Sequence, residues 1–131
     1  MHLSLVTVVV DDYDAAIGFF VGVLGFELAA DNAARTTDGR DKRWVVVQPA
    51  GGGTGLLLAR ADGSAQAAVV GQQTAGRVGF FLEVDDFDAT YAHLTAAGVR
   101  FVRPPRTESY GRVAVFLDVA GNKWDLLGPL P

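Results

Sequence analysis

The sequence contains two copies of one short motif, and this repetition limits the possible folds more than any other feature. VDDYDA occupies residues 10–15 and VDDFDA occupies residues 84–89, so corresponding residues lie 74 positions apart. Further along, RWVVVQPAGGGTGLLLA (43–59) and RVAVFLDVAGNKWDLLG (112–128) share an arginine, an apolar strand, a glycine-containing turn and a second apolar strand, 69 positions apart. Similar stretches in the same order at nearly one offset predict a chain made of two copies of one module.

Each copy predicts a strand, a helix and three further strands. Residues 6–10 form a short β-branched run that is typical of a buried strand. Asp12 and Asp86 follow the first strand of each copy as helix N-caps, an interaction worth about 1 kcal/mol. Apolar residues then recur at helical spacing until a glycine, Gly25 or Gly98, ends each helix: Ala16, Phe19, Phe20, Val23 and Leu24 in the first copy, and Phe87, Tyr91 and Leu94 in the second. The remaining strands are expected near 27, at 43–48 and 55–59, and near 100, at 112–117 and 124–127.

Length and composition exclude several classes of protein. The 131 residues suit one domain, with modules at about 1–60 and 77–131 and a linker at 61–76. Half of the residues are apolar and a fifth are charged, as in an ordered globular protein. A net charge of -4 argues against a nucleic-acid partner, and the absence of cysteine excludes thiolate chemistry. The first residues hold an apolar run too short for a membrane span and no basic leader, so we expect a cytoplasmic protein without a membrane partner.

The motifs at the two ends of the chain resemble those of a known family. The opening pattern V-x-D-x-x-x-A-x-x-F-aromatic is followed by LGF at 24–26, and DVAGNKWDLL at 118–127 is similar to a D-P-x-G-N-x-W-E-L ending, with Val119 and Ala120 in place of Pro-x. These features resemble the vicinal oxygen chelate superfamily, which includes glyoxalases, bleomycin-resistance proteins and extradiol dioxygenases. The resemblance implies an α+β fold in which two tandem βαβββ modules curl mixed sheets around one cavity with the helices outside. It also implies a homodimer.

The resemblance also points to the residues at the superfamily's metal site. Metal-dependent members hold a divalent ion with one side chain from the first strand and one from the last strand of each module. The matching positions here are Leu5, Leu57, Gly79 and Asp125. Only Asp125 can bind a metal, whereas such ions need several His or carboxylate ligands. We therefore expect no cofactor, with a divalent metal bound through other residues as the alternative. His2 and His93 are interpreted as a terminal and a surface side chain.

Strand alternation predicts which side chains line the cavity. Leu5, Leu57, Gly79 and Asp125 share their face with Thr7, Val9, Phe81 and Glu83, and the same face is expected to carry Trp44, Val46, Ala114 and Phe116. Such a mainly apolar lining suits a medium-sized organic ligand. Alternatives stay open at this point, because Asp125 could be an ordinary hydrogen-bonded strand acid, Glu83 a solvated acid, and Trp44 and Phe81 core residues.

Two polar segments are predicted to be loops. Residues 30–42 suit either a flap beside the cavity or a solvated connection. Residues 104–112 place Tyr110 and Arg112 at a rim, where Arg112 could bind an anionic group of a ligand or pair with a nearby carboxylate.

Two hypotheses about function follow. The first is metal-independent binding of a small, largely hydrophobic organic molecule, as in bleomycin-resistance proteins. The alternative is a metal-dependent enzyme, a lyase or dioxygenase of the glyoxalase type, with a non-standard ligand set. Only one of the four superfamily metal positions carries a side chain that can bind a metal, so the sequence favours the binding hypothesis. The candidate ligand-binding residues are Leu5, Thr7, Trp44, Leu57, Gly79, Phe81, Glu83, Tyr110, Arg112, Phe116 and Asp125.

Overall fold

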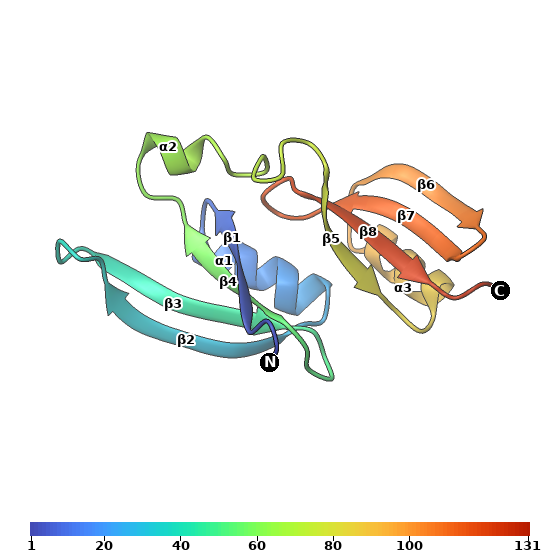
Figure 1. The fold of residues 1–131 in the computed structure, drawn as a ribbon, viewed down its shortest axis with the longest axis horizontal. Helices are drawn as coiled ribbons and strands as arrows, with labels where there is room; N and C mark the ends of the chain where they lie inside the picture. Colours follow the sequence, from blue (N-terminus) through green and yellow to red (C-terminus); the bar gives the residue numbers. More distant parts are fainter. The chain divides into compact units, whose positions relative to one another are not determined.

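The computed structural model describes residues 1–131 and contains two four-stranded mixed sheets (Figure 1). The chain divides into two compact units, Met1–Val70 and Gly71–Pro131. Each unit contains one sheet and begins its sheet with a strand that leads into a helix. The predicted α+β class with two tandem βαβββ modules is therefore confirmed.

The first unit has five elements in its βαβββ module. They are β1 (Leu5–Val10), α1 (Tyr13–Ile17) with a π-helix, η1 (Gly18–Val23), directly after it, β2 (Glu27–Arg35), β3 (Asp41–Gln48) and β4 (Gly55–Arg60). A short helix, α2 (Ser64–Ala67), follows β4. The strand order is β1-β4-β3-β2, with β1 parallel to β4 and the other pairs antiparallel.

The second unit repeats this topology. Its elements are β5 (Val78–Glu83), α3 (Phe87–Ala96), β6 (Phe101–Glu108), β7 (Gly111–Leu117) and β8 (Lys123–Gly128), with the order β5-β8-β7-β6. Thr7 is paired with Leu57 in the first sheet, and Phe81 is paired with Asp125 in the second. Thr7 and Phe81 lie 74 positions apart, and Leu57 and Asp125 lie 68 apart, so the strand register agrees with the internal repeat.

Both predicted N-caps are confirmed. The side chain of Asp12 accepts a hydrogen bond from the amide of Ala15 at 2.8 Å, and Asp86 accepts one from the amide of Ala89 at 3.0 Å. Each aspartate thereby satisfies an amide of the first helical turn that has no partner within the helix. The motif aspartates at these two positions are structural.

The first helix is less regular than its apolar spacing predicts. The α-helical part ends at Ile17, and the wider π-helical turn that follows leaves Phe20 fully buried but Phe19 and Val23 only half-buried. Since a π-turn adds a residue to each turn, side chains spaced for an α-helix no longer share one face. Gly25 follows with a φ of 78°, a conformation that glycine adopts without strain.

The two segments predicted to be loops belong largely to strands. Residues 30–35 continue β2, residues 41–42 begin β3, and only the residues between them form the turn; residues 104–108 belong to β6. β2 and β6 are the outer strands that pair with β3 and β7. An edge strand is well solvated, so polar residues are compatible with it. The loop prediction was wrong because it relied on polarity alone.

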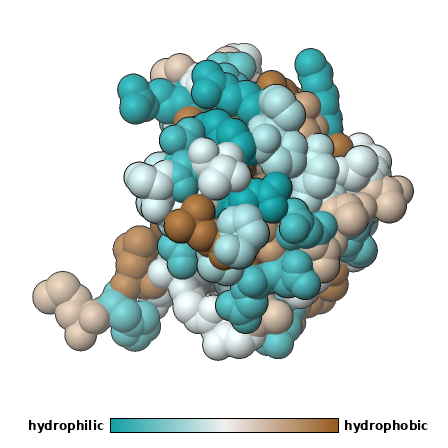
Figure 2. All heavy atoms as spheres, turned by 90° about the vertical axis from the view of Figure 1, so that its right-hand side faces the viewer, coloured by the Kyte–Doolittle hydropathy of each residue, from teal (hydrophilic) through white to brown (hydrophobic).

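Each sheet buries the face that packs against its helix. Val8, Val45, Val47 and Leu58 are fully buried in the first unit, as are Phe116 and Leu126 in the second. Burying one such side chain stabilises the fold by about 1.5–3 kcal/mol. The surface that Figure 2 presents is mostly hydrophilic, with apolar side chains in small groups. None of the helices combines the length and apolar character that a membrane crossing requires.

The closing motif DVAGNKWDLL forms a hydrogen-bonded turn between β7 and β8. The carboxylate of Asp118, which is 6% exposed, accepts hydrogen bonds from the amides of Ala120 and Asn122 at 2.9 Å each. It also accepts from Nδ2 of Asn122 at 3.2 Å and from Nε1 of Trp124 at 2.9 Å. The aspartate, asparagine and tryptophan of the motif thus fix the start of β8, the strand that carries Asp125.

Candidate ligand-binding faces

An arginine at the start of each long strand holds the helix of its unit. In the first unit, Nη1 of Arg43 lies 2.9 Å from Asp14, and the guanidinium lies 5.2 Å from the centre of the Tyr13 ring. Arg43 also binds Asp31 on β2 at 2.7 Å. The guanidinium therefore joins α1 to two strands.

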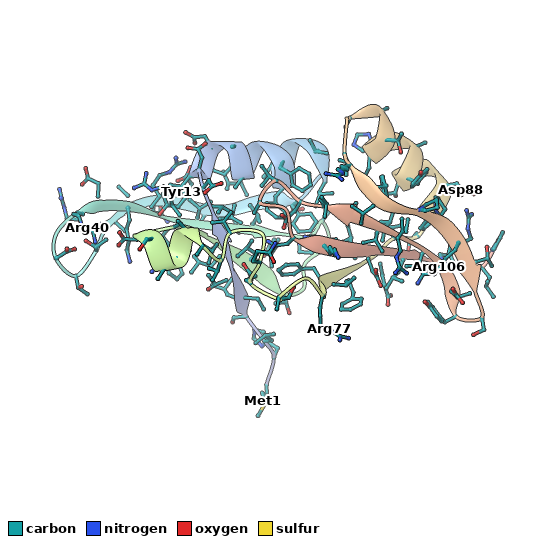
Figure 3. All side chains as sticks on the ribbon, turned by 90° about the horizontal axis from the view of Figure 1, so that it is seen from above. Met1, Tyr13, Arg40, Arg77, Asp88 and Arg106 are labelled. Atoms are coloured by element: carbon teal, nitrogen blue, oxygen red, sulfur yellow. The ribbon has the colours of Figure 1, made fainter.

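Arg112 forms the same contacts in the second unit. Its Nη1 lies 2.7 Å from Asp88, and its guanidinium lies 4.8 Å from the centre of the Phe87 ring. Figure 3 shows Asp88 on α3. The predicted alternative of pairing with a nearby carboxylate is confirmed for Arg112, which lies on the face of the sheet that packs against α3.

The face opposite α1 is apolar across the first sheet. Thr7, Leu57, Val46 and Ala30 are paired in that order from β1 to β2 and form one row on this face. A Cβ on Gly55 would lie 3.0 Å from Cδ2 of Leu5, so glycine leaves the space that Leu5 fills. The superfamily metal positions of this unit are thus occupied by packed hydrocarbon.

A cavity of about 250 Å³ lies beside β3 and β4 and is lined from both faces of the first sheet, with Trp44 and Leu57 from the face opposite α1 and Tyr13, Arg43 and Leu58 from the α1 side. Trp44, which is 44% exposed, and Leu57 are the two candidate ligand-binding residues that line it. Its polar lining includes Lys42, Arg60 and Gln66. Much of the lining is charged, since Arg40, Asp41, Arg43 and Asp62 also line the cavity, and an indole among such groups suits an organic ligand that carries polar groups as well.

The corresponding row of the second sheet carries charge. Phe81, Asp125, Val115 and Arg103 are paired in order from β5 to β6 and share the face opposite α3. By the repeat, Phe81 corresponds to Thr7 and Asp125 to Leu57. The row combines an aromatic ring that is 64% exposed with one carboxylate and one guanidinium.

Phe116 and Ala114 do not lie on this face, and their prediction as cavity residues was wrong. Phe116 is paired with Trp124 and Ala114 with Leu126, and all four are buried on the side that packs against α3. The 69-residue offset relates Val46 to Val115, so the predicted face of β7 was shifted by one residue. A shift by one residue moves every side chain of a strand to the other face.

Gly79 is covered by the loop that precedes β5. A Cβ on Gly79 would lie 2.8 Å from Cγ2 of Thr74, closer than two carbon atoms normally approach. The hydroxyl of Thr74 donates to the carbonyl of Arg77 at 2.7 Å, which holds this side chain in place. A larger residue at this position would displace the loop.

The donors at the superfamily metal positions do not fit a divalent ion. Leu5, Leu57 and Gly79 offer no ligand atom, and no group of three or more His, Asp or Glu side chains converges anywhere in the chain. A site for such an ion requires several convergent ligands.

Glu83 and Tyr110 come together at the end of the second sheet. They line a pocket of about 580 Å³ with Val84, Asp85, Leu127, Gly128 and Pro129. Tyr110 is 66% exposed, as expected for a rim residue. This pocket carries two carboxylates and suits hydrogen-bond donors.

Asp125 lines a different pocket of about 480 Å³ on the face opposite α3. Three cationic side chains, Arg103, Arg106 and Lys123, line it too. Burial raises the pKa of the Asp125 carboxyl, and the charges of Arg106 and Arg103 oppose this only in part. Sequence reasoning missed Arg106 because residues 104–112 were interpreted as a loop, and it missed Arg103 because the strand expected near residue 100 was not extended to it; β6 in fact runs from Phe101 to Glu108.

The two sheets and these pockets define a duplicated βαβββ protein with small-molecule-sized hollows beside its strands. The family model described as "Glyoxalase/Bleomycin resistance protein/Dioxygenase superfamily" matches residues 2–126. The chain belongs to this superfamily, as the sequence motifs predicted.

Several relatives are similar over almost the whole chain. An uncharacterized protein of Shewanella frigidimarina is 49% identical over 128 residues, which cover 97% of this chain and 90% of that one. The solved structure of UcmS2 is 32% identical with a TM-score of 0.80 and 97% coverage of both chains. TnmS3, described as an antibiotic binding protein from Streptomyces sp. CB03234, is 33% identical with a TM-score of 0.75 and covers 98% of this chain and 96% of its own.

Proposed function

We propose that this protein binds a small, largely hydrophobic organic molecule without a metal ion. The observation that carries the proposal is the chemistry of the superfamily metal positions, where Leu5, Leu57 and Gly79 replace ligands and exposed aromatic rings lie nearby. Trp44 is 44% exposed and Phe81 is 64% exposed on the strand faces opposite the helices. Large apolar side chains that remain exposed on such faces favour a binding role.

The antibiotic-binding relative supports the same proposal. TnmS3 shares 33% identity over nearly the whole length, and its printed description concerns binding of an antibiotic. A natural product of this kind would place apolar rings on Trp44 or Phe81. Polar groups of the same unit would orient it: Lys42 and Gln66 for a ligand on Trp44, and Glu83 and Tyr110 for a ligand bound by the second unit.

The test is a thermal-shift screen of the purified, chelator-treated protein against hydrophobic natural products and antibiotics. A ligand at one hundred times its Kd stabilises the folded state by about 2.7 kcal/mol, which gives a readily measured shift. For a ligand found in the screen, Trp44→Ala should lower the affinity about tenfold if the ligand binds the first sheet, and Phe81→Ala should do so if it binds the second sheet. Val119→Ala is the control, because Val119 is similarly exposed but lies in the β7–β8 turn.

Two results would contradict the proposal. One is the absence of any shift across a broad panel. The other is one tightly held divalent ion per chain that is lost in Asp125→Ala, which would favour the glyoxalase-type enzyme. Homodimer formation and a cytoplasmic location stay predictions, to be checked by light scattering and by cell fractionation.

A further inference from the structure

The Asp125 pocket has the opposite charge to the chain as a whole. The protein carries a net charge of -4, yet Arg103, Arg106 and Lys123 line this pocket with Asp125 as its one acid. Glu108 pairs with Nε of Arg106 at 2.8 Å and neutralises part of the excess. Positive charge still predominates, and charge of one sign gathered in a hollow attracts ligands of the other sign.

The cations of this pocket keep unused hydrogen-bonding capacity. Nη1 of Arg106 is buried and has no hydrogen-bond partner. Lys123 donates to the carbonyl of Gly76 at 3.1 Å, a neutral acceptor that leaves its charge unpaired. A buried donor without an acceptor destabilises the fold, so a shift of the Arg106 side chain that brings Nη1 to a ligand oxygen would be favourable.

Asp125 does not meet this need. It makes no salt bridge with either arginine: Val115 lies between Asp125 and Arg103 in the row across the sheet, and Arg106 pairs with Glu108 instead. Figure 3 shows Arg106 on the second sheet, on the side away from Asp88 and α3. Phe81, at the other end of the row, presents an exposed ring. The row thus places an exposed ring at one end and the Arg103 guanidinium at the other, with Asp125 and Val115 between them.

We propose that Arg103 and Arg106 form an anion-accepting subsite, so that the ligand is an apolar molecule carrying a carboxylate or an equivalent anionic oxygen group. This inference rests on the proposed binding function and specifies its ligand class. The anionic group binds the guanidinium groups and its apolar body lies on Val115 and extends past Asp125 toward Phe81, while Asp125 and the Glu108 partner of Arg106 are the carboxylates that repel the charge. Guanidinium groups suit carboxylates because they donate two parallel hydrogen bonds.

The test compares two probes of the same shape, 2-naphthoate and neutral 2-naphthamide, by isothermal titration calorimetry. The wild-type protein should bind 2-naphthoate about tenfold more tightly, as expected for a charge-assisted hydrogen bond. Arg106→Met and Arg103→Met should each remove most of this difference. Asp125→Asn should increase it, and none of the three changes should alter 2-naphthamide binding by more than about twofold.

Arg100→Met is the matched control, because Arg100 is exposed and precedes β6 outside the pocket. Urea unfolding of each variant establishes that it is folded. Equal binding of both probes, unaffected by the arginine variants, would overturn the anion subsite and leave the binding function standing. Binding of 2-naphthoate alone would support the subsite and count against an apolar site, and binding of neither probe up to millimolar concentration would count against both.

Discussion

Replacing Asp118 by alanine is expected to destabilise the protein strongly without any direct effect on a ligand. The carboxylate of Asp118 accepts four hydrogen bonds within the β7–β8 turn, from two amides and from the side chains of Asn122 and Trp124. Alanine removes the acceptor but leaves all four donors in place. The turn then has to open or keep unsatisfied donors.

The size of the effect follows from the burial of those donors. Asn122 is 2% exposed and Trp124 is 3% exposed, so water cannot replace the lost acceptor without distortion. Each buried donor without a partner costs about 1–3 kcal/mol. Two side-chain donors and the turn amides give an expected loss of about 3–5 kcal/mol, a large part of the roughly 5–15 kcal/mol that stabilises a typical domain.

Urea unfolding followed by circular dichroism measures this loss. Asp85→Ala is the control, since Asp85 is exposed and caps no helix, and its effect is expected to stay within about 0.5 kcal/mol. Trp124→Phe removes one donor, so Asp118→Ala should cost less in that background than in the wild type. A loss below about 1 kcal/mol for Asp118→Ala would refute the structural role of the motif. Loss of ligand binding at unchanged stability would place Asp118 in the binding site instead.

Two further predictions concern the second sheet. Asp125→Asn should raise the free energy of unfolding at pH 7. Burial raises the pKa of Asp125 in the folded state, so the stability that protonated Asp125 contributes is fully present below the ordinary value of 3.8 and is lost as the pH rises through the folded-state pKa. Urea titrations at pH 3.5 and 7 should show the gain only at the higher pH, and an equal gain at both would contradict it. Gly79→Ala should cost about 1–3 kcal/mol in thermal unfolding because its Cβ meets Thr74 at 2.8 Å, and Thr74→Ala should relieve most of this. Gly22→Ala, with open space around it, is the control, and an equal cost there would argue against crowding at Gly79.

The internal repeat made much of the fold predictable. Asp12 and Asp86 cap their helices as expected, and the pairings Thr7–Leu57 and Phe81–Asp125 follow the repeat offsets. These features depend on local chemistry or on one register that both copies share. These features can be predicted from sequence because a helix cap depends on a few neighbouring residues and a buried strand depends on the apolar pattern of its own residues.

The candidate site was less predictable, because its residues depend on how strands pair. Phe116 was assigned to the wrong face by a shift of one residue. Arg103 and Arg106 face the same pocket although β6 shifts its register twice between Phe101 and Arg106. An irregular strand does not keep the simple alternation from which a face can be predicted.

The sequence by itself determined that the chain is a duplicated βαβββ protein and that three of its four superfamily metal positions lack a ligand atom. The first conclusion needs only the repeat, and the second also needs the superfamily motifs at the two ends of the chain, which locate those positions. Only the tertiary structure decided that Arg112 joins its strand to α3, while Arg103 and Arg106 lie beside Asp125. The reason is physical: whether an arginine binds a helix or lines a pocket depends on the face of the sheet it occupies, which the partner strands and their bulges set.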